Sequence, residues 1–289
     1  MIKEVPLLYF LIKFGYTITK VLIGNEKNFI MKVIILCGGR GTRLKEETEF
    51  KPKPMVNIGG KPILWHIMKI YAHYGYNDFI LALGYKAEYI KQYFLNQKAY
   101  TSDFKLNTKT HKIKYYLESR SEIDDFNITF VDTGLETLIG ERILRCAKYI
   151  PEKDEYFMWT YGDGVTDLDI NTLVAFHKKQ NTIGTITGVH PRSKYGIIKL
   201  VEDNKIESFE EKPVLSDWIN GGFGVYKREF FNYLRPGEME HPALKRLAAE
   251  KQLSLYKHEG FWASVDTHKE LEDLNSMWES GVIPWKVWK

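Results

Sequence analysis

The chain of 289 residues carries 41 Lys and Arg against 37 Asp and Glu, and 44% of its residues are hydrophobic. These are the proportions of an ordinary globular protein with a sizeable core, and the mixed distribution of charges argues against a nucleic-acid partner. The two cysteines, Cys37 and Cys146, form no CxxC pair, which argues against a disulfide framework or a zinc site and fits a reducing, cytoplasmic compartment.

The first thirty residues contain a short apolar stretch. Val5 to Phe14 is nearly all apolar, but Lys13 interrupts it, and a bilayer span needs about 20 residues. No A-x-A cleavage site of a signal peptide follows. We therefore expect no membrane partner, a domain that begins at Met31, and residues 1–30 that are an accessory segment or the product of an upstream start.

From Met31 onward, strand-like and helix-like segments alternate, which predicts parallel βαβ units. The predicted strands of this first part are 32–37, 79–83, 128–131 and 156–160, and the predicted helices are 63–74, 87–95, 141–149 and 168–180. Residues 96–127 are polar and irregular, with a strand expected near 113–117, and indicate a surface insertion.

Beyond residue 180 the pattern changes to short strands joined by short turns. These strands are predicted at 183–189, 197–201, 206–209 and 222–226, and helices near 228–234, 241–251 and 267–280 with a strand at 253–257 complete the chain. The short strands suggest an antiparallel or mixed flap. We predict one α/β domain over 31–289, with a Rossmann-like, mainly parallel mixed sheet, helices on both faces and a small antiparallel flap.

The first predicted strand runs directly into a glycine-rich loop, residues 38–44 (GGRGTRL). Glycines let the backbone approach an anion closely, and the free N–H groups of such a loop can surround the charge. A loop of this kind at the end of a buried strand is where α/β proteins bind phosphate. Arg43 adds a permanent positive charge. The pattern predicts a loop that binds a nucleoside triphosphate.

Two other phosphate-binding loops do not match. The loop of P-loop NTPases requires Gly-Lys-Ser/Thr at its end, which is absent here. The dinucleotide fingerprint requires a third glycine where this chain has Leu44, and no carboxylate follows the strand 79–83 to bind a ribose hydroxyl. A nicotinamide cofactor, and with it a dehydrogenase, is therefore disfavoured.

A lysine between two prolines is the next candidate. Pro52 and Pro54 restrict the backbone around Lys53, so that holding its ammonium group in place costs less entropy. A surface lysine is ordinarily only solvated. We predict that Lys53 contacts phosphate.

Two aspartates could hold a divalent cation. Asp163 lies between two glycines at the end of the strand 156–160, and Asp266 precedes the last predicted helix. Mg²⁺ prefers one or two protein carboxylates together with phosphates and water. The alternatives are a turn residue for Asp163 and a helix N-cap for Asp266. Asp167 and Asp169 are interpreted as caps.

Residues 36–44 and the pair Lys53-Pro54 together resemble the signature of the sugar-1-phosphate nucleotidylyltransferases, and the resemblance extends over essentially all of 31–289. It implies Arg43 and Lys53 as catalytic residues and Asp163 and Asp266 as ligands of Mg²⁺. The residues that it implies for nucleotide binding are Leu36, Gly38, Gly39, Arg40, Gly41, Thr42, Thr133, Gly134, Tyr161 and Gly162. Those that it implies for the sugar phosphate, in and around the flap, are Tyr195, Gly196, Glu211, Lys212, Asn220, Gly221 and Gly222.

Longer stretches, among them 51–55, 59–68 and 160–164, resemble the branch of this family that uses CTP and glucose 1-phosphate. They imply transfer of a cytidylyl group to give CDP-glucose and pyrophosphate, for the biosynthesis of deoxysugars and polysaccharides such as the lipopolysaccharide O-antigen. The family also implies a homo-oligomer. A uridylyl- or thymidylyltransferase, or a non-catalytic nucleotide-sugar sensor, remains an alternative.

The chain departs from the family pattern in two places. Arg40 stands where a small or apolar residue is usual, and residues 135–141 replace a stretch rich in Thr and Gly. The aromatic C-terminal tail, with Trp278, Trp285 and Trp288, is either a subunit contact or packed back onto the core.

Overall fold

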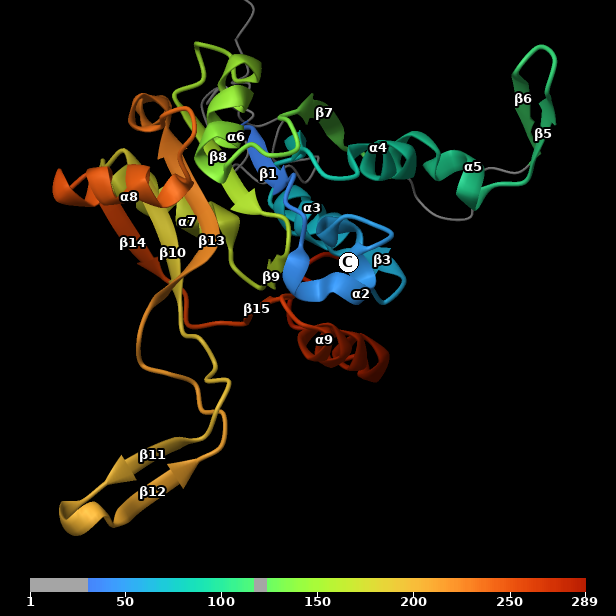
Figure 1. Ribbon diagram of the computed structural model, residues 1–289. Coiled ribbons are helices and arrows are strands. Elements are labelled where there is room, and N and C mark those ends of the chain that lie inside the picture. The colour runs from blue at the N-terminus through green and yellow to red at the C-terminus, as the bar shows by residue number, and fades with distance from the viewer. Residues whose placement is uncertain (1–30, 117–123) are drawn as a thin grey trace, which may run out of the picture. The chain divides into compact units, whose positions relative to one another are not determined.

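The computed structural model describes residues 31–116 and 124–289, and the expectations for residues 1–30 lie outside them. In the described part, a seven-stranded sheet forms the centre, with the strand order β14-β10-β13-β8-β1-β4-β7 (Figure 1). Its strands are β1 (Val33–Cys37), β4 (Asp78–Leu83), β7 (Asn127–Asp132), β8 (Tyr156–Tyr161), β10 (Gly184–Val189), β13 (Ile219–Lys227) and β14 (Leu253–Lys257). Only β13 runs antiparallel to its neighbours within this sheet. The predicted fold class is confirmed.

Helices cover both faces of the sheet. They are α3 (Ile63–His73), α4 (Ala87–Leu95), α6 (Ile139–Cys146), α7 (Ile170–Gln180), α8 (Glu240–Ala249) and α9 (His268–Ser280). Successive residues of β1 point to opposite faces: Ile35 is buried in one apolar cluster with Ile67 of α3, and Ile34 in another with Ile143 of α6. Burial on both faces explains why β1 reads as a continuous apolar run.

Shorter elements connect these strands and helices. They are η2 (Thr42–Leu44), α2 (Lys45–Thr48), η3 (Lys53–Met55), β2 (Asn57–Ile58), β3 (Lys61–Pro62), α5 (Gln97–Thr101), η4 (Ala147–Tyr149), β9 (Gly164–Thr166), η5 (Glu202–Asn204), η6 (Arg228–Tyr233) and β15 (Trp262–Ser264). The helix expected near 228–234 is the 3₁₀ helix η6.

Two exposed hairpins complete the fold. The insertion contains β5 (Phe104–Asn107) paired with β6 (Lys112–Tyr115), and the flap consists of β11 (Ile197–Leu200) paired with β12 (Ile206–Glu210). The flap was expected to include the strands near 183–189 and 222–226 as well. These strands are β10 and β13, which pair with each other and with β14 and β8 in the central sheet. The flap is consequently smaller than predicted.

The C-terminal tail packs back onto the core. Trp285 is fully buried, and its indole N–H donates to Nδ1 of His66 at 3.3 Å. Nε2 of the same imidazole donates to the carbonyl of Ile58 at 2.9 Å, so both ring nitrogens of His66 are bonded. Trp288 is also buried. Within the described chain, no helix has the length and hydropathy needed to cross a membrane.

Candidate functional site

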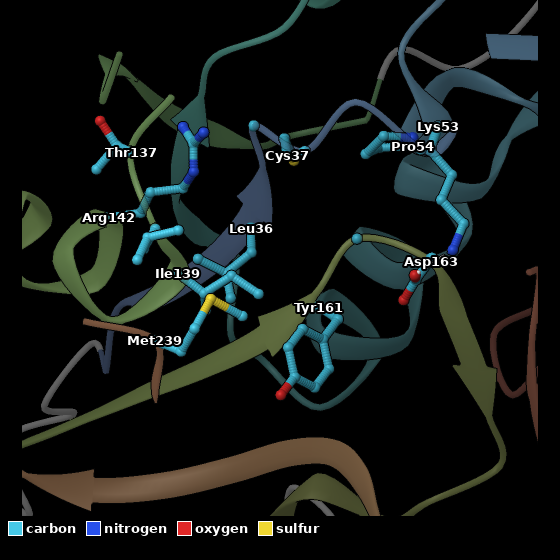
Figure 2. A pocket seen from close by; sticks show the side chains of 15 residues that line it. Leu36, Cys37, Lys53, Pro54, Thr137, Ile139, Arg142, Tyr161, Asp163 and Met239 are labelled. Atoms are coloured by element: carbon cyan, nitrogen blue, oxygen red, sulfur yellow. Dashed lines mark hydrogen bonds and ion pairs between the residues drawn. The ribbon is translucent and has the colours of Figure 1, made fainter. Parts of the chain in front are cut away.

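A pocket lies at the carboxyl ends of β1 and β8. From β1 the sheet continues through β4 and β7 on one side, and the chain then returns to β8 on the other side of β1. Such a reversal of strand order opens a crevice at the carboxyl edge of a sheet, where ligands of α/β proteins bind. The residues that line the pocket are Leu36, Cys37, Gly38, Gly39, Gly41, Lys53, Pro54, Thr137, Leu138, Ile139, Arg142, Tyr161, Gly162, Asp163 and Met239 (Figure 2).

The glycine loop forms one wall of this pocket. Gly41 adopts a positive φ of 63°, which glycine tolerates without strain. The hydroxyl of Thr48 donates to the carbonyls of Gly41 at 3.1 Å and of Leu44 at 2.9 Å and so fixes the end of the loop. Gly39 and Thr42 are exposed. The loop therefore presents its backbone toward the pocket, as expected of a phosphate-binding segment.

A buried arginine that the sequence analysis did not single out lies opposite Lys53 in the pocket. Arg142, in the first turn of α6, is only 4% exposed. Its guanidinium donates to the hydroxyl of Thr133 at 2.6 Å and to the carbonyls of Gly134 at 2.7 Å and Leu135 at 3.0 Å. A Cβ at position 38 would collide with this guanidinium, so a larger residue there would force the Arg142 side chain to move. Arg142 thereby hydrogen-bonds to the loop after β7 and packs against the glycine loop at Gly38.

The end of β8 supplies a second buried polar pair. The hydroxyl of Tyr161 donates to Oε1 of Glu240 at 2.7 Å, and Glu240 is 8% exposed. Burial, then the charge of Glu240, raises the pKa of Tyr161, so the hydroxyl remains the donor. A Cβ on Gly162 would lie 2.6 Å from the carbonyl of Leu36, which explains the glycine at this close approach of β8 to β1.

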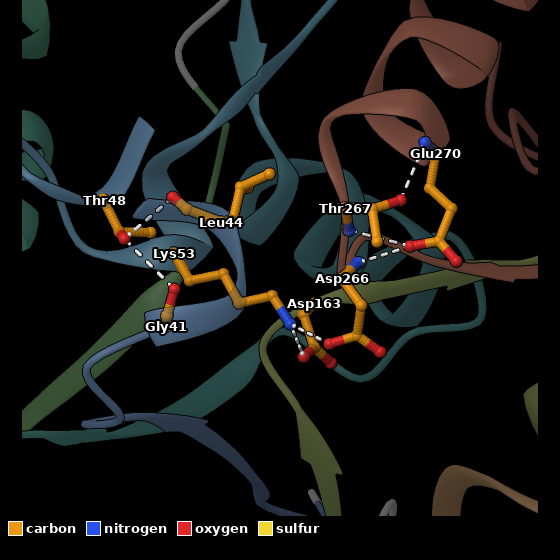
Figure 3. A network of polar contacts seen from close by, with 8 residues as sticks. All are labelled: Gly41, Leu44, Thr48, Lys53, Asp163, Asp266, Thr267 and Glu270. Carbon is orange, nitrogen blue, oxygen red and sulfur yellow. Dashed lines mark hydrogen bonds and ion pairs between the residues drawn. The ribbon is translucent and has the colours of Figure 1, made fainter. Parts of the chain in front are cut away.

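Lys53, Asp163 and Asp266 meet at one side of the pocket (Figure 3). The ammonium of Lys53 donates to Oδ2 of Asp163 at 2.6 Å and to Oδ1 of Asp266 at 2.8 Å. The two aspartates are 103 positions apart in the sequence (266 − 163) and come together because β9 pairs with β15. Burial by itself would lower the pKa of the Lys53 ammonium, but the charges and hydrogen bonds of the two carboxylates outweigh it and raise that pKa.

This pair of carboxylates fits a divalent cation that is shared with phosphate. Within residues 31–116 and 124–289 no group of three or more His, Cys, Asp or Glu side chains could hold a metal by itself. Mg²⁺ is commonly bound by one or two carboxylates, with substrate phosphates and water completing its coordination. Asp163 and Asp266, beside a phosphate-type loop, meet that description.

The alternative roles of the aspartates are resolved by their contacts. Asp169 accepts from the backbone N–H of Thr172 and caps α7, as predicted. Asp167 does not act as a cap, because it pairs with Nε2 of His258 at 2.9 Å. The N-cap of α9 is Thr267 rather than Asp266. The cap interpretation of Asp266 is therefore wrong, and its carboxylate is directed to Lys53 instead.

The predicted nucleotide residues lie in different places. Leu36, Gly38, Gly39, Gly41, Tyr161 and Gly162 line the pocket. Arg40 and Thr42 line a separate pocket, and the carbonyl of Gly134 accepts from Arg142. Thr133 is fully buried and its hydroxyl is bonded to the carbonyl of Leu83 and to Arg142, so that it supports the site from behind. The side chain of Arg43 lies outside the described part of the structure, and its catalytic role stays a prediction.

The two departures from the family pattern contact each other. Arg40, in the glycine loop, forms an ion pair with Glu136, which belongs to the unusual stretch 135–141. Both side chains are largely exposed. The ion pair links the two loops that flank the pocket.

The predicted sugar-binding residues are more dispersed. Gly222 lies against the ring of Tyr161, and the neighbouring Gly221 accepts at its carbonyl from the indole N–H of Trp262 at 2.8 Å. Asn220 precedes them in β13. The other four border the flap hairpin; they are Tyr195, Gly196, Glu211 and Lys212. None of the seven is among the described residues that line the pocket.

Arg142, Glu240 and Met239 were missed because α6 and α8 carry no recognisable motif. Their only sequence signal is position: each lies at the start of a helix that follows a loop at the edge of the sheet. The segment Thr137 to Ile139, which also lines the pocket, lies in the stretch where the chain departs from the family pattern.

Comparison with known proteins defines the class. The sequence profile of the nucleotidyl transferase family matches residues 32–280, and the chain belongs to this family. It is 43% identical over 261 residues to a probable glucose-1-phosphate cytidylyltransferase of Bacillus subtilis (strain 168), covering 89% of this chain and 100% of the relative. It is 41% identical over 262 residues to the glucose-1-phosphate cytidylyltransferase of Salmonella typhi, covering 90% and 100%.

Solved structures agree on the fold. A UDP-glucose pyrophosphorylase in complex with UDP-glucose superimposes with a TM-score of 0.63 at 18% identity, covering 87% of this chain and 99% of the other. A putative glucose-1-phosphate thymidylyltransferase from Bacillus anthracis gives a TM-score of 0.60 at 18% identity, covering 86% and 94%. At such low identity these likenesses concern the fold alone.

Proposed function

We propose that this protein transfers the cytidylyl group of CTP to α-D-glucose 1-phosphate and releases pyrophosphate and CDP-glucose, a precursor for deoxysugar and polysaccharide biosynthesis. The observation that carries the proposal is the cluster of Lys53, Asp163 and Asp266 beside the glycine loop at the switch point of the sheet. The choice of cytosine and glucose is supported by the two cytidylyltransferases that match over their full length. Residues 31–289 act as the catalytic domain in this proposal.

The reaction demands little acid–base chemistry from the protein. An oxygen of the sugar phosphate attacks the α-phosphorus of CTP, the bond to the β-phosphate breaks, and pyrophosphate leaves with that electron pair. The attacking oxygen is already anionic near neutral pH, so no strong base is needed. The difficulty lies in bringing two polyanions together, and positioned positive charge overcomes it.

Different residues of the pocket bind the triphosphate, contact the α-phosphate and neutralise the leaving pyrophosphate. The backbone N–H groups of 38–42 bind the triphosphate, and Lys53 contacts the α-phosphate, where negative charge accumulates. Arg43 neutralises the pyrophosphate that leaves. Arg142 orders the loop after β7 through its hydrogen bonds to Thr133, Gly134 and Leu135.

Asp163 and Asp266 would hold Mg²⁺. When bound, the cation supplies charge neutralisation and orientation for the phosphates of the nucleotide. The two carboxylates lie within reach of the same ammonium, which supports their acting on a common ligand.

The sugar phosphate binds on the side of the flap. Lys212 provides the cation for its phosphate, and Glu211, Tyr195 and Gly196 approach the sugar from the base of the flap hairpin. Asn220, Gly221 and Gly222 contact the sugar from β13. Support for this part comes from Gly222, which packs on the pocket residue Tyr161.

The direct test is pyrophosphate release with glucose 1-phosphate and Mg²⁺, with CTP, UTP, dTTP and ATP compared in parallel. We expect release with CTP and formation of CDP-glucose. Release with UTP or dTTP instead would keep the chemistry and overturn the choice of base. No release with any nucleotide would overturn the proposed reaction with glucose 1-phosphate.

We further infer a cytoplasmic homo-oligomer. Both hairpins expose large apolar side chains, among them Leu106 and Ile113 on the β5–β6 pair and Ile198 and Phe209 on the β11–β12 pair. Apolar surfaces of this kind mark subunit contacts. Light scattering after size-exclusion chromatography tests the inference, and a monomer at micromolar concentration would contradict it. The two cysteines are free and buried, which is consistent with a reducing compartment.

A further inference from the structure

The ammonium of Lys53 stands where a metal ion would bind. It lies 2.6 Å from one carboxylate oxygen of Asp163 and 2.8 Å from one of Asp266, and the Lys53 side chain is 13% exposed. Pro52 and the 3₁₀ helix η3 fix the backbone from which this side chain extends. The lysine therefore supplies one positive charge to both carboxylates.

A divalent cation and this ammonium compete for the same two carboxylates. Two positive charges a few ångströms apart repel each other strongly in a partly buried site, where water screens them poorly. The carboxylates of Asp163 and Asp266 gain less from a metal while Lys53 already offsets one of their two negative charges. For a metal to bind, the ammonium must first find another anion.

The glycine loop places that anion within reach. Lys53 lines the same pocket as Gly38, Gly39 and Gly41, and lysine has four rotatable methylenes. A triphosphate seated on the loop would offer oxygens to the ammonium on the pocket side of the cluster. The lysine could then leave the carboxylates without becoming an unpaired charge.

We propose that Lys53 is an internal counter-ion that keeps Asp163 and Asp266 closed to divalent metal until the phosphates of the nucleotide draw its ammonium away. The proposal rests on the metal site of the proposed function. It makes metal and nucleotide bind cooperatively, because each favours the state in which Lys53 has left the aspartates. The free enzyme accordingly binds metal weakly.

The test measures Mn²⁺ binding without nucleotide, by electron paramagnetic resonance of free Mn²⁺, in the wild type and in Lys53→Met. Methionine keeps the length of the side chain and removes the charge. We expect the variant to bind Mn²⁺ at least about tenfold more tightly, within the usual range of coupling between sites. Equal or weaker binding by the variant would overturn the proposal.

Two controls locate the effect. Lys51→Met removes a neighbouring lysine that pairs with Glu47, and it should leave Mn²⁺ binding unchanged. Adding Asp163→Asn to Lys53→Met should abolish the gain. A gain that survives the loss of Asp163 would place the metal elsewhere and refute the proposal.

A chemical variant covers the case in which Lys53→Met fails to fold. Lys53→Cys can be alkylated with bromoethylamine, which restores an ammonium at nearly the original position, or with iodoacetamide, which does not. The native Cys37 and Cys146 are buried, and burial raises the pKa of the Cys37 thiol well above its usual range, so neither competes for reagent. Weak Mn²⁺ binding should return only with the ammonium, and identical binding by the two adducts would refute the proposal. Neither readout uses catalysis, so a failure here is distinct from a failure of the nucleotide panel.

Discussion

Replacing Arg142 by alanine should destabilise the fold and the nucleotide site together. Its guanidinium donates to four oxygens, those of Leu83 (3.3 Å), Thr133 (2.6 Å), Gly134 (2.7 Å) and Leu135 (3.0 Å). A hydrogen bond to a charged group contributes about 1.5–3 kcal/mol. The carbonyl of Leu83 keeps a bond from Thr133, and the adjacent pocket admits water to the others. A net loss of ~3–5 kcal/mol in the free energy of unfolding is therefore expected.

The assay is urea denaturation of Arg142→Ala and Arg142→Lys, combined with the KM for CTP. Lysine keeps the charge but cannot reach all four oxygens, so about half of the loss should remain. The exposed Arg235 provides the control, and Arg235→Ala should change stability by less than ~0.5 kcal/mol. If Arg142→Ala lost less than ~1 kcal/mol with an unchanged KM, the guanidinium would not hold the loop after β7 and the reasoning would be refuted.

Three further predictions concern activity, the loop contact and pH. Lys53→Ala should lower kcat by about 100- to 1000-fold, because one positioned charge-stabilising group is lost. A near-normal turnover rate would show that Lys53 is not a catalytic residue. Glu136→Gln removes the ion-pair partner of Arg40 and frees its guanidinium for the triphosphate. Because an exposed ion pair contributes at most ~1 kcal/mol, the KM for CTP should fall by no more than about fivefold. A higher KM would contradict a phosphate role for Arg40. Burial lowers the pKa of His66 from its ordinary value of about 6.5 to about 4. The unfolded chain therefore takes up a proton before the folded one does, and stability falls as the pH drops from about 6.5 towards 4. Between pH 7 and 4.5 this linkage amounts to ~2 kcal/mol, and denaturation of His66→Gln should show a correspondingly weaker pH dependence.

The glycine loop was predictable because its information is local. A run of β-branched residues that ends in glycine specifies a buried strand and a close approach to anions without reference to the rest of the chain. The sequence pattern also placed the glycine loop and Asp163 at the ends of predicted strands, and parallel strands align their carboxyl ends. These inferences need only the period of the apolar residues and the order of the elements.

The flap and the tail show where local information ends. The residue pattern of segments 183–189 and 222–226 predicts strands. It does not distinguish strands of a separate flap from strands of the central sheet. Pairing with β14 and β8 decided the matter. The tail could equally have been an interface, but its tryptophans fill the space around His66. Both outcomes depend on which apolar surface of the folded domain remains exposed for these segments to pack against.

The sequence by itself determined the class of the fold, the phosphate-type loop and the residue types suited to the chemistry, because periodicity, glycine geometry and charge act over a few neighbouring residues. Only the tertiary structure decided that Lys53 bridges two carboxylates, that Arg142 bonds to the loop after β7, and that Arg40 pairs with Glu136. These contacts join positions that are far apart along the chain or belong to different loops. Their geometry is set by strand order and by the pairing of β9 with β15, which no local pattern encodes.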